Sequence, residues 1–360
     1  MALQEGNIET LAKLMQAKKE EGEEPFVLVL GAGASLSSGS PGMDEIIARI
    51  QEASGRDRRA LSKEEIKTEF YRLLDNLTAD ERYHLFKDLF EKARPSVGYL
   101  KLAELAKESY FKYILTTNYD WLLEDAFREA RMTVNRDYAV FVVEKDEESQ
   151  ILRQLRFPRP SVKVLKLHGD LSARIFKFTP KEIFEFPKKL EKTITDLLSR
   201  DFIIIGHSMR DPDLDRCIRR EGGAIWYVNP EPPSIDSYIR QAMEVRQSRY
   251  INKQFGRFDD FFIKLHSLVL GIPPEERRIR EAIVPEAKER LEWEEKDLIE
   301  IYRKLLNDRT VRFKTLQQGM VTLSPEERQK ALEQERKEIR RLLDALAQHG
   351  YIITPELDIT

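Results

Sequence analysis

Short apolar runs alternate with longer amphipathic segments over most of the chain. The apolar runs are rich in Val, Ile and Leu, which is typical of strands buried on both faces of a parallel sheet. They cover residues 26–30, 111–115, 138–143, 162–167, 202–205 and 224–228. Helical spacing of apolar residues predicts helices over 7–20, 120–131, 211–220 and, as one or two helices, 180–200. This alternation predicts an α/β fold, a doubly wound, Rossmann-like parallel sheet covered by helices on both faces.

Two regions depart from the alternation. Residues 43–108 carry apolar side chains at three- and four-residue intervals over a length too great for one crossover helix, which predicts a helical insertion. After Gly-Ile-Pro-Pro at 271–274 the chain becomes heavily charged and helical in pattern. We therefore expect a main domain over residues 1–270 and a helical region over 271–360. Apolar stripes in the latter must be buried, which predicts assembly or partner contacts or, alternatively, solvated helices that only cover the core. The stripes are Leu291, Leu298, Ile301 and Leu305, then Leu332, Ile339, Leu342, Leu343 and Leu346.

The composition excludes several classes of function. The chain has 60 basic and 63 acidic residues and a formal net charge of −3, so it has no general attraction for nucleic acid or an anionic membrane. No apolar run approaches the roughly 18 residues of a membrane span, and residues 1–24 lack the apolar core of a signal peptide. We expect a cytoplasmic protein. The single cysteine, Cys217, cannot form an internal disulfide or a cysteine-rich zinc site, so no metal is expected.

A glycine-rich loop, Gly31-Ala32-Gly33-Ala34-Ser35, directly follows the first predicted strand. Glycines allow a sharp turn and a close approach to a ligand. A helix beginning near Pro41 or Met43 would direct its free N–H groups at a phosphate in this loop. However, Leu36 stands where the dinucleotide fingerprint has its third glycine, and no strand ending in an acid follows about 20 residues on. The loop therefore predicts either a nucleotide site or a tight turn without a ligand.

Polar clusters follow four further predicted strands. In open α/β sheets ligands bind at the carboxyl ends of the strands, where these clusters would meet. Taken singly, each cluster could also be purely structural, because Asn118 and Asp120 could begin a helix and Asn229-Pro230 is a common turn pair. His168 could equally be a hydrogen-bonded histidine at a strand end. The clusters are Thr116–Asp120, His168–Asp170, Gly206–Asp211 and Asn229–Pro230.

Taken in this order, the motifs resemble the sirtuin family. The matching residues are Gly31–Ser35 with Gly39 and Pro41, Thr116–Asp120, His168–Gly169, Gly206 with Ser208, and Asn229. The resemblance extends over about residues 26–230. The Thr-Thr-Asn-Tyr-Asp form, and the Gly-x-Ser-x-x-Asp-Pro-x-Leu form that ends at Leu214, look especially like the sirtuin-like effectors of bacterial anti-phage systems.

The resemblance implies that NAD⁺ binds at these motifs. It implies that Asn118 lies beside the nicotinamide ribose and that His168 is the catalytic base, so these two are the predicted catalytic residues. The residues it implies for binding NAD⁺ are Gly31, Ala32, Gly33, Ser35, Thr117, Asp120, Gly206, Ser208 and Asn229.

Departures from the family pattern favour hydrolysis over deacylation. Protein-deacylating sirtuins usually carry a four-cysteine zinc ribbon, and they generally have glutamine where Thr117 stands. Their aspartate-phenylalanine-arginine run is also missing after Pro41. We therefore predict an NAD⁺ glycohydrolase that releases nicotinamide and ADP-ribose in abortive-infection defence. The alternatives are a sensor that binds NAD⁺ or ADP-ribose without turnover, and a deacylase or ADP-ribosyltransferase.

The resemblance also implies partners, since an enzyme that depletes NAD⁺ must stay inactive until infection. We expect a homo-oligomer and a defence partner such as a HerA-like ATPase, with a short Argonaute as the alternative. Direct binding to nucleic acid or to a membrane is not expected.

Overall fold

The computed structural model describes residues 3–41, 76–177, 186–207, 211–271, 313–317 and 324–348, with positions 46, 51, 72, 74, 182, 306, 309 and 310. The chain divides into two compact units, Met1–Leu270 and Gly271–Thr360. The candidate site residues all lie in the sequence of the first unit.

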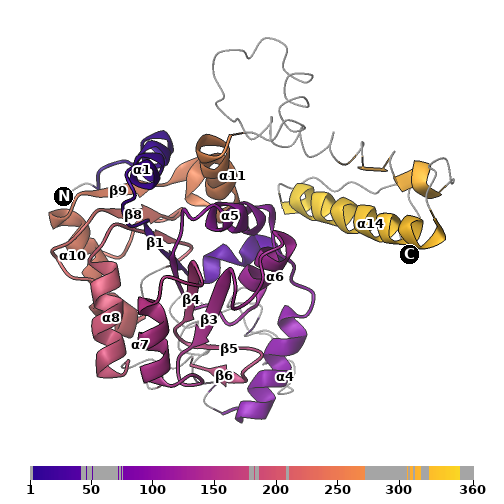
Figure 1. Ribbon diagram of the computed structural model, residues 1–360. Coiled ribbons are helices and arrows are strands. Elements are labelled where there is room, and N and C mark those ends of the chain that lie inside the picture. The colour runs from indigo at the N-terminus through magenta and orange to yellow at the C-terminus, as the bar shows by residue number, and fades with distance from the viewer. Residues whose placement is uncertain are drawn as a thin grey trace. The chain divides into compact units, whose positions relative to one another are not determined.

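A seven-stranded sheet forms the centre of the first unit, in the order β3-β4-β2-β1-β7-β8-β9 (Figure 1). Every pair of neighbouring strands in it is parallel. The predicted doubly wound α/β class is therefore confirmed. The strands are β1 (Val27–Leu30), β2 (Tyr113–Thr116), β3 (Tyr138–Val142), β4 (Val162–Lys166), β7 (Phe202–Ile205), β8 (Ile225–Val228) and β9 (Ser248–Ile251).

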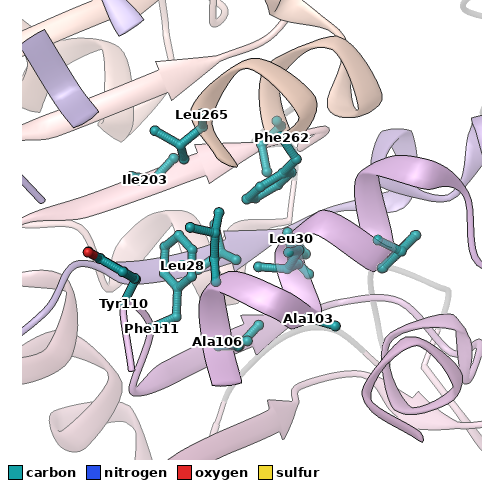
Figure 2. Close-up of a cluster of buried hydrophobic side chains, with 14 of the residues drawn as sticks. Leu28, Leu30, Ala103, Ala106, Tyr110, Phe111, Ile203, Phe262 and Leu265 are labelled. Carbon is teal, nitrogen blue, oxygen red and sulfur yellow. The ribbon is translucent and has the colours of Figure 1, made fainter. Parts of the chain in front are cut away.

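Helices cover both faces of this sheet because successive side chains of its central strand point to opposite sides. Leu28 and Leu30 of β1 join one buried cluster, whereas Val27 and Val29 join another. Figure 2 shows the first cluster, in which side chains from β1, α5 and α11 pack together. Helices on that face are α1 (Ile8–Glu20), α5 (Val97–Lys107), α6 (Leu122–Glu129) and α11 (Phe258–Val269). The opposite face is covered by α7 (Glu148–Arg156), α8 (Lys188–Leu198), α9 (Pro212–Arg216) and α10 (Tyr238–Val245).

The region predicted as an insertion contains two kinds of helix. α4 (Ala79–Phe90) begins with a capping box between Thr78 and Glu81. It packs with the hairpin of β5 (Gly169–Asp170) and β6 (Ile175–Phe176) in a small cluster separate from the two main ones. In contrast, α5 packs on the main sheet and leads into β2. The accessory structure therefore precedes α5, and most of residues 42–75 lies outside the described part of the chain.

The second unit contains one long described helix, α14 (Pro325–Gln348). Ile339 and Leu342 of the second predicted stripe are buried, and Arg309 pairs with the buried Glu335 at 3.1 Å. The stripe from Leu291 to Leu305 and the side chain of Leu346 lie outside the described residues. Among the described helices of the whole chain, none combines the length and the apolar character needed to cross a membrane.

Candidate active site

The candidate site lies where the direction of the sheet order reverses. From β1 the chain continues to β2 on one side, and it later returns to β7 on the other side of β1. The loops that follow β1 and β7 therefore diverge, which creates the crevice where ligands bind in doubly wound sheets. The first loop contains Gly31–Ser35 and the second begins at Gly206.

Glycines allow these two loops to touch. A Cβ atom on Gly31 would lie 2.5 Å from the carbonyl oxygen of Gly206, and one on Gly206 would lie 2.4 Å from the amide nitrogen of Ala34. Gly206 also has a positive φ of +65°. The N–H of Gly33 donates to the carbonyl of Gly206 at 2.8 Å. These glycines thus allow the close contact between the two loops; the ligand approach expected from the sequence stays a prediction.

Two 3₁₀ turns, η1 (Ala32–Ala34) and η2 (Leu36–Ser38), follow the first strand. The helix start predicted near Met43 lies outside the described residues. Ala32, at the tip of the first turn, is exposed.

Asn118 is buried at the end of β2 with its amide orientation fixed. Its Nδ2 donates to the carbonyl of Gly31 at 3.1 Å and to the Ser35 hydroxyl at 3.0 Å. The Oδ1 atom is buried and has no hydrogen-bond partner among the described residues. A buried acceptor of this kind costs stability unless a ligand or water satisfies it. Asn118 therefore offers one acceptor to a hydroxyl or water donor.

Three further side chains hold Asn118 in place. The Ser35 hydroxyl donates to Oδ2 of Asp120 at 2.7 Å and lies 2.9 Å from the Tyr99 hydroxyl. Burial raises the pKa of Asp120, while the Ser35 hydrogen bond and the charge of Lys166 oppose that rise. Burial also raises the pKa of Tyr99 well above its ordinary value, so this phenol stays protonated. Tyr99 comes from α5, and its place inside an apolar helical pattern gave no sign of this role.

Lys166 holds the Asn118–Asp120 segment through a hydrogen bond and two ion pairs. Its Nζ donates to the carbonyl of Asp120 at 2.7 Å and pairs with Asp170 at 2.5 Å and Glu124 at 2.6 Å. Burial alone would lower the pKa of Lys166, but the two carboxylates outweigh it and raise the pKa. The charged lysine therefore links β4, the β5–β6 hairpin and α6 to the loop that carries Asn118.

His168 follows the end of β4, a strand that pairs with β2. The register of the two strands ends with Thr116 opposite Lys166, and Asn118 and His168 each come two residues after that last pair. The Nε2 atom of His168 lies 3.0 Å from Oδ2 of Asp213 in α9, and the two side chains are only 2% and 3% exposed. The sequence pattern did not single out Asp213, although it lies within the Asp-Pro-x-Leu motif.

The other predicted binding residues surround this centre. The N–H of Thr117 donates to the carbonyl of Leu30 at 3.2 Å. Asn229 uses its side chain within the protein, since Nδ2 donates to the carbonyl of His207 at 3.3 Å and Oδ1 accepts the N–H of Glu231 at 3.2 Å. Ser208 lies outside the described residues. Hydrogen bonds thus connect Asn118 with Gly31 and Ser35, and Ser35 with Asp120. In the same loop, the N–H of Gly33 bonds to the carbonyl of Gly206.

This fold and site define a Rossmann-like α/β protein with a buried polar centre at the switch point of its sheet. Residues 112–251 match the family model described as SIR2-like domain. The predicted resemblance to sirtuin-like proteins is therefore confirmed over these residues.

Two relatives named NAD(+) hydrolase match just over half of the chain. It is 26% identical over 211 residues to the NAD(+) hydrolase ThsA of Bacillus cereus (strain MSX-D12), covering 56% of this chain and 41% of that protein. It is 28% identical over 210 residues to the NAD(+) hydrolase ThsA of Acinetobacter baumannii (strain 532279), covering 56% and 40%. The chain thus spans about two fifths of the length of these relatives.

Among solved structures, the crystal structure of a Sir2 homolog–NAD complex overlaps 75% of this chain and 96% of its own, at 16% identity and a TM-score of 0.44. Within the residues that the structure describes, no three His, Cys, Asp or Glu side chains are grouped so that they could hold a metal ion.

Proposed function

We propose that this chain is an NAD⁺ glycohydrolase that cleaves the bond between nicotinamide and ribose. The observation that carries the proposal is the unsatisfied Oδ1 of Asn118, which is buried after β2, while His168 follows the end of the neighbouring strand β4. An acceptor in this position suits a ribose hydroxyl or the attacking water, both of which donate hydrogen bonds. The matches to two proteins named NAD(+) hydrolase support the same substrate.

The reaction follows from the residue types. When the C1′–N bond breaks, its electron pair moves to the pyridinium nitrogen, and nicotinamide leaves as a neutral molecule. Water then forms the new C1′–O bond and loses a proton to His168, which later returns that proton to solvent. NAD⁺ and water thus give nicotinamide, ADP-ribose and one proton. A positioned histidine base is worth about 10²-fold to 10⁴-fold in rate, and the hydrogen-bonded asparagine supplies orientation.

The same residues weigh against the other activities. A sensor that binds without turnover has no need of the buried pair of His168 and Asp213. Deacylation of proteins lacks support because the chain's single cysteine cannot build the four-cysteine zinc ribbon. As an enzyme that depletes NAD⁺, the protein would act as an effector in anti-phage defence. Its activity would be gated by self-association or by a partner such as a HerA-like ATPase or a short Argonaute.

Release of nicotinamide from NAD⁺ tests the proposal. We expect the purified protein, alone or in an activated assembly, to release nicotinamide and ADP-ribose in equal amounts. Asn118→Ala and His168→Ala should each lower kcat by about 10²-fold or more and leave the fold intact. The control is His84→Ala, which removes an exposed histidine of α4 and should retain full activity. Tight NAD⁺ binding without turnover in every assembly state would indicate the sensor instead. Full activity in either site variant would refute the assignment of its residue.

A further inference from the structure

We infer that Asp213 is a positioning residue that fixes His168 in one tautomer and one ring orientation, with Nε2 protonated and Nδ1 left as the basic nitrogen. The catalytic consequence rests on the function proposed above, whereas the pairing itself can be tested without it. The inference adds a residue from α9 to a site that is also built from the loops after β1, β2, β4 and β7 and from Tyr99 of α5.

The geometry of the pair supports this role. An ionised carboxylate only accepts hydrogen bonds, so the proton in the 3.0 Å contact between Nε2 of His168 and Oδ2 of Asp213 belongs to the imidazole. A neutral imidazole carries one N–H, and placing it on Nε2 makes Nδ1 the acceptor. Both side chains are almost fully buried, so water does not compete for this hydrogen bond.

The carboxylate is itself fixed in orientation. Its other oxygen, Oδ1, accepts the N–H of Leu214 at 2.7 Å, and the carbonyl of Asp213 accepts the thiol of Cys217 at 3.3 Å. Leu214 and Cys217 are fully buried in the core cluster that α9 shares with the sheet. The ring of His168 is thus tied through Asp213 to a helix that cannot rotate without disturbing this core.

The backbone around His168 is equally constrained. Gly169 follows it with a φ of +114°, and a Cβ there would lie 2.0 Å from the carbonyl oxygen of Ile175. The N–H of Lys177 donates to the carbonyl of His168 at 2.9 Å. The β5–β6 hairpin therefore fixes the main chain while Asp213 fixes the side chain. Together they determine which nitrogen of His168 faces the crevice, as a base requires.

A neighbouring carboxylate in α9 provides a matched control. Asp215 is also buried, but it accepts the N–H groups of Tyr238 at 3.0 Å and Ile239 at 3.1 Å, at the start of α10. Each of its two carboxylate oxygens thus serves a backbone group of a neighbouring helix. Comparing Asp213→Asn with Asp215→Asn therefore separates an effect on the histidine from a general loss of packing in α9.

The direct test is the tautomer of His168, measured by long-range ¹H–¹⁵N correlation on ¹⁵N-histidine-labelled full-length protein. The chain has five histidines, and the His168→Gln variant assigns the relevant signal. We expect the proton on Nε2 in the wild type and in Asp215→Asn. We expect a changed or mixed tautomer in Asp213→Asn, because an amide can donate as well as accept. A wild-type proton on Nδ1, or an unchanged tautomer in Asp213→Asn, would overturn the inference.

Kinetics give the second readout. Asp213→Asn should lower kcat for nicotinamide release by about 10²-fold and change KM little, while Asp213→Glu should recover part of the loss. Asp215→Asn should lower stability and keep kcat. If Asp213→Asn does not fold, the wild-type tautomer and Asp213→Glu still decide the question. A wild-type protein that binds but never cleaves NAD⁺ would refute the proposed function, and the tautomer would then judge the pairing by itself.

Discussion

The contact between the loops after β1 and β7 predicts a large difference between two similar glycine substitutions. Gly206 and Gly22 have nearly equal positive φ angles, +65° and +70°. A Cβ on Gly22 would meet nothing within 4 Å, whereas one on Gly206 would lie 2.4 Å from the nitrogen of Ala34 and 2.8 Å from the carbonyl carbon of Gly33. Alanine at either position incurs the same backbone penalty, and only Gly206→Ala adds a collision with backbone.

The magnitudes follow from these distances. A left-handed backbone costs an alanine about 1–2 kcal/mol relative to glycine, which is the whole effect expected for Gly22→Ala. At Gly206 the new methyl group lies about 1 Å inside ordinary van der Waals contact. Forcing the two loops apart adds about 1–3 kcal/mol, as for other overpacked sites. We therefore expect Gly206→Ala to lower the free energy of unfolding by roughly 2–5 kcal/mol.

Urea denaturation of the two variants and the wild type measures this difference. Gly206→Ala should also reduce nicotinamide release, because a displaced first loop moves the Gly31 carbonyl that holds Nδ2 of Asn118. Gly22 takes no part in that contact, and a Cβ there meets nothing within 4 Å, so Gly22→Ala should keep its activity. Equal destabilisation by the two substitutions would refute the argument that the loops are in tight contact.

Two further predictions concern Ser35 and Glu104. Ser35 forms hydrogen bonds with Asn118 and Asp120 inside the protein. Ser35→Ala should therefore remove about 1–3 kcal/mol of transition-state stabilisation, which lowers kcat and changes KM little. A rise in KM alone would indicate a phosphate contact instead. Burial alone would raise the pKa of Glu104, but the hydrogen bond from His266 and the charge of Lys101 outweigh it and lower the pKa below its ordinary value. The resulting stabilisation is present above the ordinary pKa of Glu104 and is lost as the pH falls through the lowered pKa. The difference in unfolding free energy between the wild type and Glu104→Gln should therefore shrink on acidification. A difference that grows would contradict this prediction.

The sequence pattern predicted most of the sheet because its central strands are buried on both faces. A short continuous apolar run such as Phe202–Ile205, bounded by polar residues, is typical of a strand in this position. The edge strand β9 escaped prediction, since its sequence, Ser-Arg-Tyr-Ile, lacks such a run and its pairing with β8 comes from the fold. Helices α7, α10 and α11 were also missed. Of these, α7 is polar apart from Leu152 and the buried Ile151 and Leu155.

For the candidate site, the sequence indicated the residues at strand ends and missed those that come from helices. Asn118 and His168 follow apolar strands, so their position in the sequence is enough to identify them as candidate site residues. Tyr99 and Asp213 lie in helices whose relation to those strands depends on the crossover geometry. No spacing in the chain connects residue 99 with residue 118, or residue 213 with residue 168. Such partners become visible only when the sheet order brings α5 and α9 to the same crevice.

The glycine loop shows how one pattern can have two physical causes. Its glycines predicted a close approach to a phosphate, but the amide of Gly33 is bonded to Gly206 and the Ser35 hydroxyl to Asp120. The carbonyl of Gly31 at the same time holds the amide of Asn118. The loop thus positions Asn118, the proposed catalytic asparagine, while the contact with Gly206 positions the loop itself. A ligand that enters this crevice would therefore meet a pre-oriented acceptor, as the proposed cleavage of NAD⁺ requires.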